Sequence, residues 1–197
     1  MAGSVSHSSE TIHVEVPIFD DLDVQELPPK RQQEVIFRSR PFINSHWRFP
    51  PDIRLCSASG VSETRLRQAM QYWNRLGYTF GSVVIDDNSI ICVQGGTYFE
   101  ITILLVTNDL PIEGNLALTK TYIHRETREV TRAQIYINSR AAIKERVLEH
   151  EIGHALGWAH FNRKYHMMNR DYGLGGHDST GLTKREYDSQ ISDLTSE

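Results

Sequence analysis

The sequence predicts an α+β fold: a mixed, twisted sheet of about five strands with a backing helix, a second helix that follows the sheet, and a C-terminal helix. Two observations predict it. β-rich runs separated by turn residues occupy most of 78–138, and apolar residues recur at helical spacing over 62–76, 141–156 and 183–194. The 197 residues correspond to one domain, or one domain with a tail, because a domain averages about 150 residues.

Residues 1–40 are predicted to form an acidic N-terminal arm or tail, and 41–197 the folded domain. The arm is rich in Ser at its start and in Asp and Glu before Pro28 and Pro29, and its apolar residues show no sustained period. A hydrated linker is the favoured interpretation, because acidic runs usually remain solvated. The alternatives are an arm that binds a partner protein and a prosegment that covers a functional site with a carboxylate.

The first strand and the backing helix are predicted at the start of the folded domain. Residues 52–58 alternate between apolar and polar, as a strand does. Ser62 can cap the helix that follows, and Gly77 suits the left-handed residue after its end. The apolar face of this helix, which we expect in the core, comprises Leu66, Ala69, Met70, Trp73 and Leu76.

Five further β-rich runs are predicted to complete the sheet, at 78–86, 90–94, 99–108, 116–123 and 132–138. The run at 99–108 is almost continuously apolar, which is typical of a central strand covered on both faces. The last two runs are joined by a polar stretch that we interpret as a solvated turn.

A long helix is predicted over 141–156, capped by a side chain at 138–139. After it, 161–181 reads as an irregular loop, and irregular loops of this length are usually functional. The last helix begins at Thr183, where Glu186 completes a capping box, and ends near residue 194. The buried side of the 141–156 helix is expected to comprise Ile143, Val147, Leu148, Ile152 and Ala155.

Charge and composition exclude several classes of protein. With 21 Lys and Arg against 25 Asp and Glu, the net charge of −4 favours neither nucleic acid nor an anionic membrane as a partner. No segment resembles a secretory signal peptide or reaches the ~20 apolar residues of a membrane-spanning helix. We therefore expect synthesis in the cytoplasm, with export by another route or association with a particle left open.

The two cysteines, Cys56 and Cys92, are too few for a disulfide scaffold or a multi-cysteine zinc site. In a cytosolic chain they are expected to be reduced thiols, because cytosolic buffers keep thiols reduced. A mature secreted fragment would reverse this expectation.

The segment HEIGHALGWAH, from His150 to His160, carries the chemistry of the chain. Four residues advance an α-helix by about 400°, so His150 and His154 lie on one face and can share a metal ion. Gly157 permits a backbone turn that a β-carbon would penalise, and this turn can bring His160 to the metal as a third ligand.

Three neutral imidazoles leave the fourth tetrahedral position of Zn²⁺ open for water, which is typical of a catalytic zinc site. Zinc lowers the pKa of such a water to about 7 and polarises a carbonyl group. Glu151 can reach this water without binding the metal, and is the candidate general base. The segment thus predicts one zinc ion and metal-assisted hydrolysis.

HEIGHALGWAH matches the HExxHxxGxxH signature of the metzincin metallopeptidases, so the chain resembles this family. Met168, eight residues after His160, is similar to the Met-turn of the matrixin branch, and fits it better than Met167. The resemblance covers about 45–195 and implies a zincin/metzincin-like fold whose zinc helix is the active-site helix. It also implies a methionine that lies beneath the metal as an apolar floor.

The resemblance further implies that 114–123 is the edge strand that binds an extended polypeptide antiparallel. It assigns the loop of 169–181 to the pocket for the side chain that follows the scissile bond. The residues of the edge strand that would bind substrate are Leu118, Thr119, Lys120, Thr121 and Tyr122.

The chain departs from the family at several positions. The stretch at 106–113 lacks the histidines that bind a second zinc in matrixins, so we predict a single metal. Cys56 lies within a predicted strand, which argues against a cysteine switch. Arg170 occupies the position at which astacins and serralysins have a tyrosine, and matrixins have a proline after the turn that this chain lacks.

The leading hypothesis is a zinc endopeptidase whose partner is a polypeptide substrate. The alternative is a non-catalytic, metal-stabilised structural or binding component of a larger assembly, such as a viral particle, with the N-terminal arm docked on a partner protein. A third possibility is zinc hydrolysis of a non-peptide amide.

Overall fold

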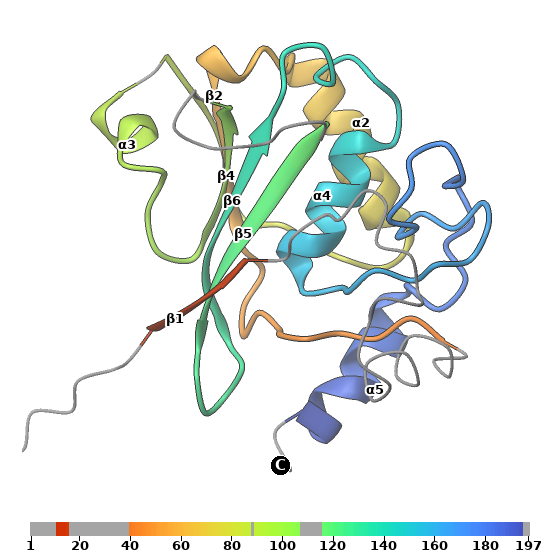
Figure 1. Ribbon diagram of the computed structural model, residues 1–197. Coiled ribbons are helices and arrows are strands. Elements are labelled where there is room, and N and C mark those ends of the chain that lie inside the picture. The colour runs from red at the N-terminus through yellow and green to blue at the C-terminus, as the bar shows by residue number, and fades with distance from the viewer. Residues whose placement is uncertain (1–10, 16–39, 88, 107–115, 195–197) are drawn as a thin grey trace, which may run out of the picture.

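The computed structural model describes residues 11–15, 40–87, 89–106 and 116–194. The chain has an α+β fold built on one mixed sheet of six strands. Figure 1 shows α2 and α4 on one face of this sheet and α3 on the other, with α5 below. The strands are β1 (Thr11–Glu15), β2 (Asp52–Cys56), β3 (Val83–Asp86), β4 (Glu100–Leu105), β5 (Ala117–His124) and β6 (Val130–Ile137).

The strand order is β1-β5-β6-β4-β2-β3. The four strands from β6 to β3 run parallel, and β5 runs antiparallel to both of its neighbours. The prediction for 99–108 is confirmed in its central part, since β4 lies between β6 and β2 and five of its six residues are buried. An interior strand must be covered on both faces, which explains its continuous apolar run.

The backing helix agrees with its prediction. The helix α2 (Glu63–Arg75) begins after Ser62, whose side chain accepts a hydrogen bond from the backbone N–H of Arg65. Gly77 follows the helix with a left-handed φ of 93°. Trp73 is fully buried and donates from Nε1 to the backbone carbonyl of Glu149, which holds α2 against α4.

The helix that carries the histidines is shorter than predicted: α4 spans Val147–Leu156, and 141–146 form turns. Asn138 accepts backbone hydrogen bonds from 141 and 142, so it closes a turn and does not cap a helix. Arg146 has a φ of 68°, a left-handed conformation that interrupts any helix entering α4. Ile143, predicted to be buried, is therefore 81 % exposed.

The predicted strand at 90–94 is also wrong, because α3 (Ile90–Val93) forms there. Ser89 caps this short helix by accepting from the N–H of Ile91 at 3.3 Å. Ile90 and Val93 are 66 % and 77 % exposed, so their apolar character does not reflect burial in a sheet. A pattern argument that equates apolar runs with buried strands fails at such a segment.

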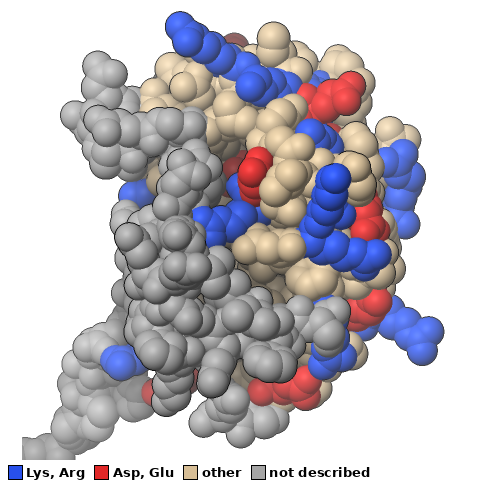
Figure 2. Space-filling model, turned by 45° about the vertical axis from the view of Figure 1, so that its right-hand side comes forward, with Lys and Arg blue, Asp and Glu red and all other residues tan. Residues whose placement is uncertain are grey.

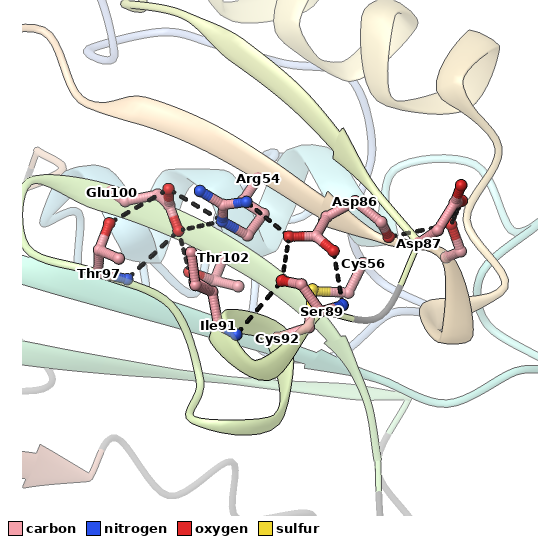
Figure 3. A network of polar contacts seen from close by, with 11 residues as sticks. Arg54, Cys56, Asp86, Asp87, Ser89, Ile91, Cys92, Thr97, Glu100 and Thr102 are labelled. Atoms are coloured by element: carbon pink, nitrogen blue, oxygen red, sulfur yellow. Dashed lines mark hydrogen bonds and ion pairs between the residues drawn. A yellow bond between two sulfur atoms is a disulfide. The ribbon is translucent and has the colours of Figure 1, made fainter.

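The structure contradicts the expectation of reduced thiols, since Cys56 and Cys92 form a disulfide between β2 and α3. Their Cα atoms lie 5.9 Å apart, within the range that a disulfide spans. The expectation rested on the redox compartment alone and could not anticipate this proximity. Figure 3 shows the polar network beside the disulfide.

Arg54 is the centre of that network. Its Nη1 donates to Asp86 at 2.6 Å and its Nε donates to Glu100 at 3.0 Å (Figure 3). Asp86 also accepts from the hydroxyl of Ser89 at 2.6 Å. The network and the disulfide together attach α3 to the face of the sheet opposite α4.

The C-terminal helix α5 (Lys184–Leu194) follows its prediction. Thr183 donates from its backbone N–H to Glu186, and the N–H of Glu186 donates to the hydroxyl of Thr183, which is a complete capping box. Tyr187 is buried and its hydroxyl donates to the carbonyl of Leu156 at the end of α4. Within the described part of the chain, none of the helices has the length and apolar character that crossing a membrane requires.

The strand expected at the edge of the sheet has a neighbour on its outer side. β5 was predicted as a free edge, but β1 pairs with it antiparallel, from Thr11 opposite His124 to Glu15 opposite Lys120. Five residues of the predicted arm thus form a strand of the sheet. The alternation of Ile12 and Val14 with polar residues is typical of a strand, but this pattern is short and does not indicate which strand it pairs with.

Candidate metal centre

The helix α4 places two histidines one turn apart. The Nε2 atoms of His150 and His154 lie 3.0 Å from each other, and His160 brings its Nε2 to 3.1 Å from that of His154. The three ligand atoms all lie within 4.8 Å of one another. The spacing argument therefore holds in three dimensions, and these residues could together hold one metal ion.

Gly157 makes the approach of His160 possible. The residue ends α4 with a φ of 109°, and a β-carbon there would lie 2.0 Å from the backbone oxygen of Ser45. The carbonyl of Gly157 accepts from the N–H of Asn44, and the N–H of Ala159 donates to the carbonyl of Phe42. The chain after α4 is thus turned back against the segment at 42–45, and a glycine is required for this contact.

The protonation of the rings suits metal binding. The Nδ1 of His150 lies 2.8 Å from the carbonyl oxygen of Met167, and the Nδ1 of His154 lies 2.8 Å from that of Trp158. A carbonyl oxygen only accepts, so each Nδ1 carries the proton and each Nε2 presents a lone pair. Lone pairs this close repel each other unless a cation lies between them, so the donor set fits a metal that prefers imidazole ligands.

Burial and positive charge keep the three rings neutral. Burial lowers the pKa of His150 to about 4 and that of His160 to about 3, and lowers the pKa of His154 well below its usual value. The positive charges of Arg146 and Arg170 add to this effect at His150 and His160, respectively. Neutral imidazoles are the form that binds a metal.

Glu151 lies beside the histidines and is 2 % exposed. Its Oε2 accepts a hydrogen bond of 2.6 Å from the hydroxyl of Thr119 on β5. Burial raises the pKa of Glu151 to about 7, and the hydrogen bond from Thr119 partly offsets this rise. A carboxyl group with such a pKa can accept and release a proton at neutral pH.

Met168 is fully buried and lies close to Gly153 of α4, and its role as an apolar floor beneath a metal stays a prediction. A β-carbon on Gly153, the residue before His154, would lie 2.4 Å from the Sδ of Met168, so the glycine allows the methionine to approach the helix. His166 fixes this turn, since its Nδ1 accepts from the N–H of Met168 and its Nε2 donates to the carbonyl of Thr180. Met167 supplies the carbonyl that binds His150.

The five residues proposed to bind substrate alternate across β5. Thr119 and Thr121 face α4, and both line a small cavity that reaches His154. Lys120 lies with its Nζ 6.0 Å from the ring of Tyr136, and Tyr122 lines the cavity beside the disulfide, so both point to the opposite face. Leu118 is half-buried on the same face as Lys120 and Tyr122. It lies outside the part of β5 that pairs with β1.

Sequence reasoning missed the side-chain contact of Thr119, which was chosen only as part of a strand. A polar residue on the inward face of β5 is the signal that could have drawn attention to it, because a buried hydroxyl needs a partner. Reasoning also missed Arg146, which lines a cavity of about 80 Å³ beside His150 and Glu151. The stretch at 107–115, within which most of the expected second-metal region falls, lies outside the described residues.

No protein-family model matches the chain, and no curated protein is significantly similar to it. The case for a function therefore depends on the residues of the site and their geometry.

Proposed function

We propose that the chain is a zinc-dependent endopeptidase of the metzincin type, similar to the catalytic domain of the matrixins. The single observation that carries the proposal is the convergence of three imidazole Nε2 atoms beside one buried carboxyl group, Glu151. A structural zinc site closes its four positions with protein ligands, whereas three histidines leave one position for the reaction. Hydrolysis also needs a general base, and a carboxyl group that lies next to the three histidines without binding the metal can serve as one.

The residues would divide the work as follows. His150, His154 and His160 would hold the zinc, which when bound polarises the peptide carbonyl and acidifies the attacking water. Glu151 accepts the proton of that water on its carboxylate and passes it to the nitrogen of the leaving amine. Thr119 keeps the carboxylate in place through the 2.6 Å hydrogen bond to its Oε2.

The substrate in this proposal is an extended polypeptide. A strand such as β5 can bind an extended peptide through backbone hydrogen bonds. β1 runs antiparallel to β5, and the substrate is expected to run antiparallel to β5 as well. The peptide would bind beside Leu118 and Thr119 and would have to compete with β1 over 120–124. In this proposal β1 therefore limits access along the strand.

The test is a peptide library incubated with the purified full chain, with and without a chelator, and the cut sites identified by mass spectrometry. We expect one zinc per chain, cleavage that a chelator abolishes and zinc restores, and loss of cleavage in Glu151→Ala with zinc still bound. A full chain that binds no zinc, or cleavage that persists in Glu151→Ala, would refute the proposal. Full biological function of Glu151→Ala would favour the non-catalytic alternative.

A further inference from the structure

One backbone peptide group lies between the metal centre and a fourth histidine, His166. The carbonyl oxygen of Met167 lies 2.8 Å from Nδ1 of His150. The N–H of Met168 belongs to the same peptide group and donates to Nδ1 of His166 at 3.1 Å. A peptide group is planar and rigid, so the hydrogen bond at its N–H also fixes the direction of its carbonyl oxygen.

The imidazole of His166 is held on its other side as well. Its Nε2 lies 3.0 Å from the carbonyl oxygen of Thr180, and a carbonyl oxygen only accepts, so Nε2 carries the proton. Nδ1 then has the lone pair that the N–H of Met168 requires. The ring also lies edge-on to Phe161, with the ring centres 4.8 Å apart. Both ring nitrogens of His166 are therefore used in fixing the turn.

The same turn also contacts the chain beside the third histidine of the centre. The carbonyl of Met168 accepts a hydrogen bond of 2.8 Å from the N–H of Phe161, which directly follows His160. A displacement of the turn would therefore reach the surroundings of both His150 and His160.

The hydrogen bonds of His166 are shielded from water, although charged residues lie around it. Figure 2 brings forward the side of the molecule with the loop that contains His166, and Lys and Arg side chains are prominent on the face that it shows. Arg163 and Asp178 of this loop lie 3.7 Å apart and are partly exposed. His166 itself is fully buried. Breaking its bonds is costly, because buried polar groups that lose their partners find no water to replace them.

We propose that His166 is a positioning residue of the metal centre, which orients the peptide group between Met167 and Met168 and through it the ring of His150. The inference rests on the metal centre of the proposed function and adds a side chain that does not touch the metal. The partner of the second ring nitrogen fixes the tautomer and the orientation of a histidine ligand. For His150 this partner is a backbone carbonyl, so a substitution of Met167 does not remove it.

Two variants separate the two hydrogen bonds of His166. The amide oxygen of Asn stands as many bonds from Cβ as Nδ1 of His does, so His166→Asn can still accept from the N–H of Met168 but does not reach Thr180. The amide nitrogen of Gln stands as many bonds from Cβ as Nε2 does. His166→Gln can therefore still donate to the carbonyl of Thr180, while the N–H of Met168 loses its acceptor.

Zinc affinity at pH 7, measured by competition with a chromophoric chelator, should differ between the two variants. We expect His166→Gln to bind zinc at least about 10-fold more weakly than the wild type, and His166→Asn to remain close to the wild type. Thr102→Val controls for loss of stability alone, because it removes a buried hydrogen bond of 2.9 Å to Glu100 on the face of the sheet opposite α4. The control should keep the affinity of the wild type. Zinc binding by His166→Gln that equals or exceeds that of His166→Asn would refute the proposal.

A measurement without metal separates failure of this inference from failure of the proposed function. In chelator, ¹⁵N NMR of the full chain reports which ring nitrogen of His150 carries the proton. The wild type and His166→Asn should show it on Nδ1, and His166→Gln should show a mixture of the two tautomers. This contrast in a chain that binds no zinc or cleaves no peptide would refute the endopeptidase and keep the role of His166. The same tautomer in all three chains would refute that role.

The wild-type chain alone provides a test that does not depend on the folding of a variant. The hydrogen bond from the N–H of Met168 to Nδ1 of His166 should give a nitrogen–nitrogen coupling between these two atoms in the NMR spectrum. Absence of the coupling in the folded, metal-free chain would refute the proposal.

Discussion

The hydroxyl of Thr119 donates a hydrogen bond of 2.6 Å to Oε2 of Glu151, and so joins the strand β5 to the helix that carries the histidines. Both residues are buried, and the bond crosses the boundary between the sheet and its covering helix. A charge-assisted hydrogen bond in such surroundings orients the carboxylate and favours its ionised form. Thr119 therefore positions Glu151, although it lies 32 residues away in the sequence.

Given the proposed function, replacing Thr119 by Val should lower kcat about 10-fold with little change in KM, because the carboxylate of Glu151 loses its orientation. Without the hydrogen bond the pKa of Glu151 rises, so the acid limb of kcat/KM against pH should move to higher pH. Thr119→Ser keeps the hydroxyl and should restore both quantities. A pH profile of the Val variant that coincides with the wild-type profile would contradict this role.

The buried carboxyl of Glu151 should make the metal-free chain less stable as pH rises. Burial raises its pKa from 4.5 to about 7, so the folded chain binds the proton more tightly than the unfolded chain. The stability contributed by this proton is present below pH 4.5 and is lost by about pH 7. The Gln side chain of Glu151→Gln does not titrate. In the presence of chelator, the free energy of unfolding of this variant minus that of the wild type should therefore increase by up to about 3 kcal/mol between pH 4.5 and pH 8. Urea denaturation tests this, and a difference independent of pH would be inconsistent with it.

Zinc affinity should persist at mildly acidic pH. With the pKa of His150 at about 4 and that of His160 at about 3, few protons compete for the rings at pH 5. Lowering the pH from 7 to 5 should weaken binding less than about 100-fold, whereas three ordinary imidazoles would lose about four orders of magnitude. Competition with a chromophoric chelator measures the affinity. The larger loss would show that the rings are not held in the buried, neutral state.

Gly157→Ala should destabilise the chain by about 3 kcal/mol or more and reduce zinc binding, since the new β-carbon would collide with the backbone oxygen of Ser45. Gly60→Ala is the matched control, because Gly60 also has a left-handed φ, of 73°, but its β-carbon would find the nearest atom at 3.9 Å. The control should cost about 1 kcal/mol. Urea denaturation and zinc stoichiometry report both effects, and equal losses in the two variants would contradict the collision.

Breaking the pairing of β1 with β5 should increase the cleavage of extended peptides, given the proposed function. Val14, opposite Thr121, is the position to change, because proline removes a backbone donor from a strand. Val14→Pro should raise kcat/KM and speed hydrogen exchange at the backbone amides of β5, while Val14→Thr should change neither. Exchange that is unchanged in the proline variant would indicate that β1 does not protect this strand in solution.

Much of the fold followed from local patterns. The helix α2 and the strand β4 were predictable because their apolar residues repeat with the period of buried structure, and Ser62 and Gly77 mark the helix ends. Prediction failed where local structure does not follow from the spacing of apolar residues. Arg146 adopts a left-handed conformation that no sequence pattern predicts. In α3, the apolar residues that indicated a buried strand are exposed.

The convergence of the three histidines was predictable, because one helix and one glycine turn place three histidines that lie within eleven residues. The partners of the site were not, because they come from distant segments. Thr119, for example, reaches Glu151 from the sheet. Away from the site, the bond between Cys56 and Cys92 also could not be predicted, because it depends on a helix that was expected to be a strand. Such contacts depend on the tertiary structure, so the local spacing of apolar residues does not predict them.

The contact between Gly157 and Ser45 sets a lower limit to the length of a fragment that keeps the three histidines together. The segment from Phe42 to Ser45 supports the turn that brings His160 into place, and Pro41 packs against Gly181 in the loop that follows. A truncation that falls before Pro41 would leave the third histidine supported. A cut only a few residues further along would take away the backing of that histidine.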